Sequence, residues 1–248
     1  MKEVKLDKVY FSKKIKKANI EYDKENKKRP SWIKIKLNKK IIFIKILVNK
    51  EAFWYRRYFK NYFFPLDSNS EDYKNYYNHI AKNYESFVPQ NKRIGKLILK
   101  FLEKFNIKKK AKILDLGAGT GIISEVIVEQ GYSNLTLIDI SDKALEIAKN
   151  KEKLKNAKFL VKDFTKDKIK GKFDVVLESM SLDYFKDKVL FKILNNIKSC
   201  LKNQGIFVAV DRHIPEEFCK FFEEIEKGKL KLKTPEGVFD YYYFLGRK

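Results

Sequence analysis

The sequence predicts an α/β fold in which helices cover both faces of a seven-stranded, mostly parallel sheet. From residue 71 onward, short apolar runs typical of buried strands alternate with segments of helical periodicity, which indicates parallel strands joined by crossover helices. Near the C-terminus, two strand-like runs follow each other with only a turn between them, so we expect the sheet to end in an antiparallel hairpin. A small basic extension, expected to hold a β-hairpin and a helix, precedes this domain.

The expected elements of the domain follow in order along the chain. Helices are predicted at 71–87, 91–105, 121–130, 142–154, 187–202 and 215–227. Strands are predicted at 112–116, 135–139, 158–162, 173–178, 205–210, 229–233 and 238–245. Gly131 and Gly205 fall where helices are expected to end, since glycine tolerates the left-handed backbone of a helix terminus.

The domain boundary is predicted near residue 66, where Pro65 and the polar run Asp67-Ser68-Asn69-Ser70 interrupt the pattern. Residues 1–66 form the extension and residues 67–248 form the larger domain. In the extension, Trp32–Leu37 and Ile41–Val48 read as two strands joined by a turn at residues 38–40.

A helix is expected at residues 55–66, where aromatic side chains recur at helical spacing and basic side chains occupy the other face. Two interpretations of this helix stay open. Its aromatic face packs into a core, or it stacks on bases while Arg56, Arg57 and Lys60 meet phosphates.

Charge is concentrated in the extension. Residues 1–66 carry 20 basic and 6 acidic side chains, which is +14 of the formal net charge of +23. Only six of the 55 basic residues are arginine, and Lys, Ile, Asn, Phe and Tyr are all abundant. AT-rich codons favour this set, so genome composition explains part of the charge.

The remaining bulk features favour a reduced, cytoplasmic protein without a membrane span. Cys200 and Cys219 cannot form a disulfide framework, and Cys200 is expected in the core. No apolar segment directly follows the charged residues 1–6. The longest apolar run, Ile41–Val48, is interrupted by Lys45 and is too short to cross a bilayer.

The most informative motif follows the first strand of the domain. Residues 113–116 are apolar apart from Asp115, and Gly117, Gly119 and Gly121 come directly after them. Glycine lets the backbone turn tightly or approach a ligand, and the helix that follows directs its N–H groups at that point. The dinucleotide fingerprint G-x-G-x-x-G would need a glycine at position 122, where the chain has Ile122.

The stretch D-x-G-x-G-x-G at 115–121 resembles the signature loop of class I S-adenosylmethionine (SAM) methyltransferases. The resemblance extends over residues 71–248 and implies their seven-stranded sheet, whose last strand runs antiparallel. It implies SAM as methyl donor, S-adenosylhomocysteine as product, and no metal. Gly117, Gly119 and Gly121 would lie against the methionine part and ribose of SAM, and Asp115 would accept hydrogen bonds from the turn or from the cofactor's amino group.

The same resemblance assigns residues after the next two strands. Asp139 ends the second strand, 24 positions after Asp115, and an acid there binds both ribose hydroxyls, although NAD would use the same acid. Ile140 would pack on adenine. Asp163 would accept from the adenine amino group, and the backbone of Phe164 would meet a ring nitrogen.

Upstream, residues 77–85 resemble the Y-D-x-x-A-x-x-Y-D helix that precedes the core in many small-molecule methyltransferases. Asn78 and Glu85 replace its two aspartates, so only Tyr77 and Tyr84 are expected to cover the cofactor. The alternative is that both tyrosines belong to a packed aromatic face.

The acceptor is expected at the exit of the fourth strand, since ligands lie at the carboxyl ends of parallel strands. If the acceptor must lose a proton, Glu178, Asp183 and His213 are the candidate bases. The chain lacks both an Asn/Asp-Pro-Pro-aromatic stretch and a Pro-Cys at this exit, which argues against methylation of base amines and of pyrimidine carbons.

The resemblance implies a SAM-dependent methyltransferase. The Tyr77–Tyr84 helix and the lack of base-amine motifs favour a small metabolite as acceptor, and the basic extension favours an anionic one. The alternative acceptor is tRNA or rRNA, docked by residues 1–66. A SAM-binding module without catalysis is the third reading.

Overall fold

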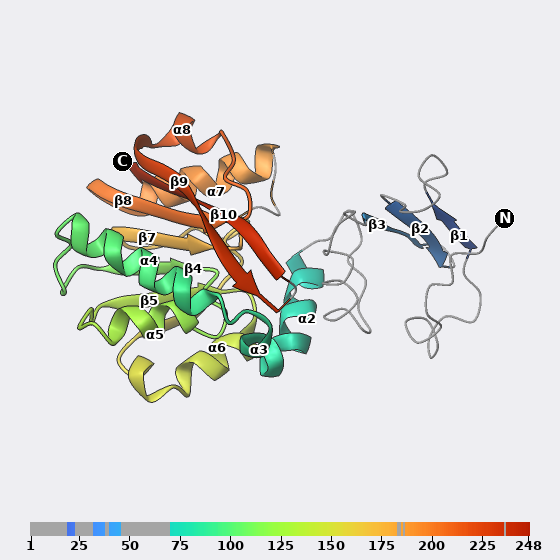
Figure 1. Cartoon of the computed structure of the whole chain (residues 1–248), viewed down its shortest axis with the longest axis horizontal. Coiled ribbons are helices and arrows are strands. Elements are labelled where there is room, and N and C mark those ends of the chain that lie inside the picture. The colour runs from blue at the N-terminus through green and yellow to red at the C-terminus, as the bar shows by residue number, and fades with distance from the viewer. Residues whose placement is uncertain are drawn as a thin grey trace. The chain divides into compact units, whose positions relative to one another are not determined.

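The computed structural model describes residues 19–22, 32–37, 40–45, 70–182, 185, 187–235 and 237–248 (Figure 1). The chain divides into two compact units, Met1–Tyr76 and Tyr77–Lys248. Helix α2 (Ser70–Ile80) contains the division between them.

The first unit contains a three-stranded antiparallel sheet in the order β1-β2-β3. Its strands are β1 (Asn19–Tyr22), β2 (Trp32–Leu37) and β3 (Lys40–Lys45). Trp32 pairs with Lys45 and Leu37 with Lys40, so the predicted hairpin is present. The sequence did not predict β1, which is only four residues long. The predicted aromatic helix at 55–66 lies outside the described residues.

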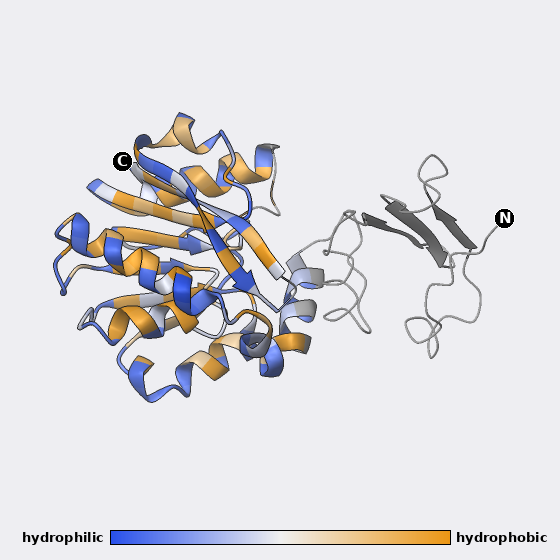
Figure 2. Ribbon diagram, in the orientation of Figure 1, coloured by the Kyte–Doolittle hydropathy of each residue, from blue (hydrophilic) through white to orange (hydrophobic). Residues whose placement is uncertain are grey.

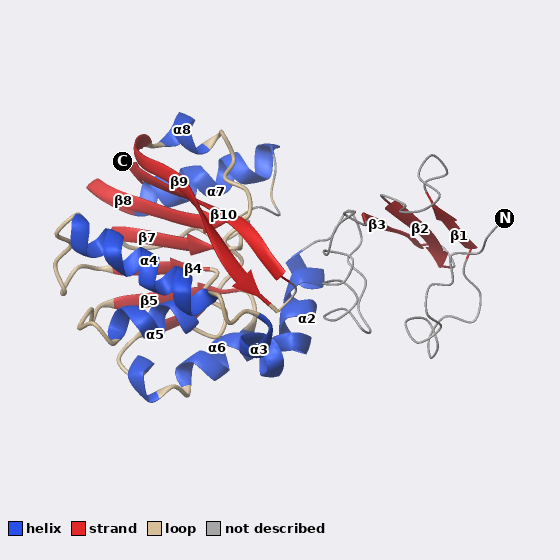
Figure 3. Cartoon of the chain, viewed as in Figure 1, coloured by secondary structure: helices blue, strands red, loops and turns tan. Residues whose placement is uncertain are grey.

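The larger unit is built on a seven-stranded sheet in the order β6-β5-β4-β7-β8-β10-β9 (Figure 3). The strands are β4 (Ile113–Leu116), β5 (Leu135–Asp139), β6 (Lys158–Val161), β7 (Phe173–Ser179), β8 (Leu201–Asp211), β9 (Glu223–Thr234) and β10 (Gly237–Arg247). Strands β4 to β8 pair in parallel. Strand β10 pairs antiparallel with both β8 and β9, and the predicted fold is therefore confirmed.

Helices pack on both faces of this sheet. They are α3 (Tyr84–Phe87), α4 (Asn91–Lys104), α5 (Ile122–Val128), α6 (Asp142–Lys149), α7 (Asp187–Cys200) and α8 (Phe218–Phe221). Neighbouring strand residues face opposite sides: Ile113 packs in one buried cluster with α4 and α5, and Leu114 packs in the other with α7. Figure 2 shows apolar residues along the strands and in stripes on these helices. The core strands are thus buried on both faces, as their continuous apolar runs predict.

Two expectations about the C-terminal part are wrong. The predicted helix at 215–227 is reduced to α8, and β9 already begins at Glu223. The Glu- and Lys-rich segment suits a helix locally, but it pairs with β10 along its whole length, with Glu223 opposite Arg247 and Thr234 opposite Gly237. This pairing overrides local propensity. Cys200, as expected, is buried.

The other wrong expectation concerns a helix end. Gly131 lies just past the end of α5 with φ 87°, as predicted. Gly205 instead lies inside β8, because α7 already ends at Cys200. The left-handed residue there is Gln204, with φ 63°.

Candidate active site

Buried carboxylates stand at the carboxyl ends of neighbouring strands. Asp115 lies on β4, Asp139 ends β5 and Glu178 lies near the end of β7, and these residues are 3%, 9% and 0% exposed. Charged groups are rarely buried in this way without partners. Their common location therefore marks this edge of the sheet as the candidate site.

The glycine turn between β4 and α5 adopts a backbone that favours glycine. Gly117, Gly119 and Gly121 have φ of 77°, 55° and 77°. A Cβ at Gly117 would lie 2.6 Å from Oγ of Ser181, and one at Gly121 would lie 2.7 Å from Cδ1 of Leu154. The spacing of the motif is therefore required by both backbone and packing.

Asp139 holds this turn against the end of β5. Its Oδ2 accepts the N–H of Gly119 at 2.8 Å, and its Oδ1 accepts the N–H of Ser141 at 2.8 Å. Burial raises the pKa of Asp139, and the hydrogen bonds from backbone N–H groups oppose that shift. A carboxylate oxygen accepts more than one hydrogen bond, so these contacts leave capacity for ribose hydroxyls. Ile140 follows directly and is half-buried.

Asp115 is held from the opposite side of the turn. Its Oδ2 accepts the hydroxyl of Ser124, on α5, at 2.6 Å. Burial raises the pKa of Asp115 to about 6, the Ser124 hydrogen bond lowers it, and the charge of Asp139 raises it further. A cation placed beside this carboxyl would reverse the shift.

A pocket opens beside these groups, with about 300 Å³ of empty space that includes open solvent. It is lined by Tyr84, Asn91, Asp115, Gly117, Ala118, Thr120, Ile122, Ile123 and Ser179. The side-chain oxygens of Asn91, Thr120 and Ser179 are buried there without a hydrogen-bond partner. Buried polar atoms are normally paired, so this pocket fits a polar ligand such as the methionine part of SAM.

The loop after β6 carries Asp163 and Phe164, two of the residues expected at adenine. Oδ1 of Asp163 accepts the N–H and the hydroxyl of Thr165, at 3.0 and 2.5 Å, which closes this loop. Phe164 is 9% exposed, and its ring would lie 4.0 Å from a Cβ at Gly117. It packs edge-on against Phe185, with ring centroids 5.9 Å apart.

Tyr84 covers the glycine turn. Its Cε1 would lie 3.5 Å from a Cβ at Gly119, and its ring meets Tyr77 edge-on at 6.4 Å. Burial and the negative charge of Asp139 raise the pKa of the Tyr84 hydroxyl. The two motif tyrosines therefore lie together, and Tyr84 lies at the pocket.

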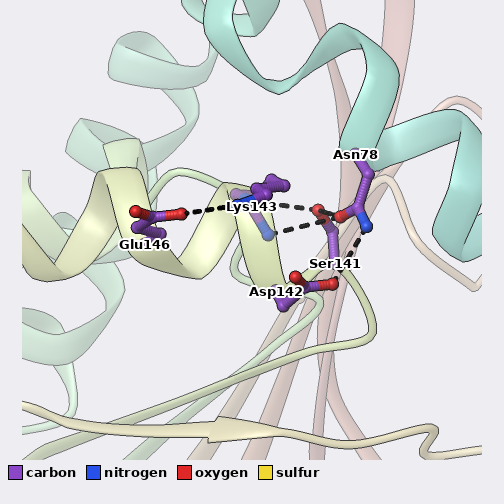
Figure 4. Close-up of polar contacts among 6 residues, drawn as sticks. Asn78, Ser141, Asp142, Lys143 and Glu146 are labelled. Atoms are coloured by element: carbon purple, nitrogen blue, oxygen red, sulfur yellow. Dashed lines mark hydrogen bonds and ion pairs between the residues drawn. The ribbon is translucent and has the colours of Figure 1, made fainter.

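The sequence did not assign a role to Asn78, which the structure places at the start of α6 (Figure 4). Its Oδ1 accepts the hydroxyl of Ser141 at 2.6 Å and the N–H of Lys143 at 3.3 Å, and its Nδ2 donates to Oδ1 of Asp142 at 2.9 Å. An aspartate at 78 would place a second carboxylate against Asp142.

The three candidate bases differ in environment. Oε1 of Glu178 accepts the N–H and hydroxyl of Ser181, at 2.7 and 3.1 Å, and the N–H of Leu182 at 3.0 Å. Glu178 thus organises the turn that follows β7. His213 is exposed just beyond β8, and Asp183 lies outside the described residues.

Sequence patterns did not single out Asn91 or Thr120 as pocket residues. Thr120 lies inside the glycine motif, where its position could have drawn attention. Asn91 follows Pro89-Gln90 at the start of α4, and no motif marks it. Only packing of α4 against α5 brings Asn91 to the pocket.

Comparison with known proteins identifies the family. A family model described as a methyltransferase domain matches residues 107–243, which is more than half of the chain. The chain belongs to this methyltransferase domain family. The predicted methyltransferase domain is confirmed.

Curated relatives of this methyltransferase domain differ in acceptor. The chain is 26% identical over 154 residues to malonyl-[acyl-carrier protein] O-methyltransferase of Acetivibrio thermocellus, covering 61% of this chain and 53% of the relative. It is 30% identical to EEF1A lysine methyltransferase 2 of Danio rerio, covering 57% and 66%. It is 28% identical to ribosomal protein L11 methyltransferase of Dictyoglomus thermophilum, covering 58% and 46%. The chain thus spans about half to two thirds of these relatives.

Solved structures share the fold. Magnesium protoporphyrin IX methyltransferase from Synechocystis, with bound SAM, superposes with a TM-score of 0.61 at 13% identity, covering 73% of this chain and 97% of that one. The [4+2]-cyclase SpnF has a TM-score of 0.60, also at 13% identity, with the same coverage. Within the described ranges, no helix combines the length and apolar character needed to cross a bilayer.

Proposed function

We propose that this chain transfers a methyl group from SAM to a small metabolite that carries an anionic group. The observation that carries the SAM assignment is the glycine turn between Asp115 and Asp139, with unpartnered oxygens of Asn91 and Thr120 beside it. The sulfonium of bound SAM supplies a methyl group that is electrophilic without a metal.

The residues that would hold SAM follow the turn and its neighbours. Gly117, Gly119 and Gly121 leave the backbone bare beside the methionine part, Asp115 would face the amino group, and Asp139 would take the ribose hydroxyls. Ile140, Asp163 and Phe164 would surround adenine. Tyr77 and Tyr84 would cover the site and exclude water.

The acceptor would enter at the exit of β7, where orientation behind the methyl group supplies most of the rate enhancement. For a hydroxyl acceptor we propose His213, Asp183 and Glu178 as the bases to test, in that order. His213 is exposed to an incoming substrate. Glu178 comes last because its Oε1 already accepts three hydrogen bonds.

Charge supports an anionic acceptor. Residues 67–248 carry 35 basic and 26 acidic side chains, so the net positive charge of this part of the chain favours the approach of anions. The charge of residues 1–66 favours RNA as the second candidate, docked through that extension. The names of the relatives point to a further class, a protein or protein-borne acceptor.

One experiment separates these acceptors. The full chain is incubated with methyl-labelled SAM and a cytoplasmic extract, in keeping with the predicted location, and label is counted in small-molecule, RNA and protein fractions. We expect label in the small-molecule fraction, and no transfer by an Asp139→Ala variant. Label in RNA that disappears on removal of residues 1–66 would establish the second candidate instead. SAM binding without transfer to any fraction would indicate a non-catalytic SAM-binding module.

A further inference from the structure

Asn91 is a buried polar residue to which neither the sequence motif nor the catalytic candidates assign a task. It is the first residue of α4 and is 6% exposed. Its Oδ1 has no hydrogen-bond partner. A buried amide oxygen without a partner destabilises the folded state, so its retention calls for a donor that the chain does not supply.

The pocket that Asn91 lines presents oxygen atoms and no cation. Asp115 lies there with its carboxyl 3% exposed, and the hydroxyl oxygens of Thr120 and Ser179 are also unpartnered. Among the described residues that line this pocket, none is Lys, Arg or His. Oxygens of this kind select a ligand group that carries a positive charge and several N–H donors.

Asn91 also interacts with the residue that covers the pocket. Its side chain hydrogen-bonds to the Tyr84 hydroxyl as a donor, which lowers the pKa of that hydroxyl against the effect of burial. Tyr84 in turn lies over Gly119. Asn91 therefore lies between the interior of the pocket and its cover.

We propose that Oδ1 of Asn91 accepts a hydrogen bond from the α-ammonium group of SAM, beside Asp115, while its amide nitrogen holds Tyr84 over the glycine turn. This inference rests on the proposed function, since it names a further contact of the same cofactor. It couples recognition of the amino-acid part of SAM to the placement of Tyr84. An amide fits both tasks because it offers an acceptor and a donor on one rigid plane.

The test compares two ligands in the full chain by isothermal titration calorimetry. S-adenosylhomocysteine carries the amino-acid part, and 5′-methylthioadenosine lacks it. For Asn91→Ala we expect affinity for S-adenosylhomocysteine to fall by about tenfold or more, and affinity for methylthioadenosine to stay within about twofold. Gln90→Ala is the matched control: Gln90 is also a buried amide, 1% exposed, but it donates to the hydroxyl of Tyr241 at 3.3 Å and does not line the pocket. We expect both of its affinities to match the wild type.

Asn91→Asp tests whether residue 91 contacts the ammonium group of the ligand or its neighbouring carboxylate. An aspartate still offers an oxygen to the ammonium, so we expect affinity for S-adenosylhomocysteine within about threefold of the wild type. If residue 91 contacted the ligand's carboxylate instead, the aspartate would repel it and affinity would fall. A loss as large as that of Asn91→Ala would overturn the ammonium assignment. Thermal unfolding of each variant checks that the chain is folded.

Two further outcomes separate this inference from the proposed function. If the wild type binds both ligands and Asn91→Ala weakens both equally, or weakens neither, the inference alone is overturned. If the wild type binds neither ligand, the proposed function fails and the inference fails with it.

Discussion

The N–H of Gly119 donates to Oδ2 of Asp139 at 2.8 Å, across 20 positions of sequence. This hydrogen bond joins the turn after β4 to the end of β5, so the carboxylate that we propose for the ribose hydroxyls also shapes the glycine turn. Loss of the carboxylate should therefore affect both stability and ligand binding.

Asp139→Asn tests this double role. An amide presents a donor where Gly119 or Ser141 already donates, so we expect affinity for S-adenosylhomocysteine to fall by about tenfold or more. Calorimetry measures it. Asp174→Asn is the control, because Asp174 also accepts a backbone N–H, from Lys112 at 2.7 Å, but lies at the start of β7, at the opposite end of the strand from Glu178. Equal ligand affinity in Asp139→Asn and the wild type would contradict the assignment of Asp139.

Gly121→Ala and Gly131→Ala form a matched pair for the turn. Both positions have a left-handed backbone, with φ of 77° and 87°, so each substitution costs about 1–2 kcal/mol in backbone strain. Only at Gly121 would the new Cβ meet a side chain, 2.7 Å from Leu154, whereas nothing lies within 4 Å at Gly131. We expect Gly121→Ala to lose at least about 1 kcal/mol more in urea unfolding. Equal losses of unfolding free energy in the two variants would contradict this, because the Leu154 side chain would then move away from the new Cβ at no cost in stability.

Asp115 should make stability depend on pH. Burial raises its pKa from 3.8 to about 6, so the folded state retains a proton that the unfolded state has already lost. The contribution of Asp115 to the free energy of unfolding is therefore largest below about pH 4 and falls, by of the order of 3 kcal/mol, as pH rises to about 6. Asp115→Asn should lack this dependence.

The measurement is urea unfolding of the wild type and Asp115→Asn at several pH values, because the difference between them removes the titration of other carboxyls. A difference that does not change between about pH 4 and pH 7 would refute the raised pKa. If an ammonium group binds beside Asp115, S-adenosylhomocysteine should also bind more tightly as pH rises through this range, and Asp115→Asn should lose that gain.

The hydrogen bond between Asn78 and Asp142 should survive if the amide and the carboxylate are exchanged between the two positions. Asn78→Asp should weaken the contact with α6, because a carboxylate then faces Asp142 in place of the donor at 2.9 Å. We expect a loss of about 1–3 kcal/mol in unfolding free energy. Adding Asp142→Asn restores a donor–acceptor pair and should recover most of this loss. A double variant no more stable than Asn78→Asp would disprove the pairing.

Local patterns were sufficient for the sheet core and the glycine turn. Strands β4, β5 and β7 and the second half of β8 are mostly apolar, and an apolar run of this kind indicates burial on both faces whatever the rest of the chain does. The glycine spacing likewise reports a local backbone requirement. The first part of strand β9 was predicted as helix because it is Glu- and Lys-rich, and pairing with β10 makes it a strand.

The residues of the candidate site that belong to local motifs were predictable from the sequence, and those brought in by packing were not. Asp115, Asp139 and the three glycines belong to patterns within one stretch of chain, and the structure places them around one turn. Asn78 meets Asp142 across 64 positions, and Asn91 reaches the pocket only through packing of its helix. No spacing rule joins such positions.

The sequence by itself determined the fold class, the glycine turn and the resemblance that pointed to SAM. The tertiary structure decided that Glu178 organises the turn after β7, that Asn78 bonds to Ser141 and Lys143 at the start of α6, and that Asn91 lines the pocket with Tyr84. The physical reason is the range of the interactions. Neighbouring residues determine the backbone conformation and burial of a short segment, whereas these polar contacts depend on how distant elements pack.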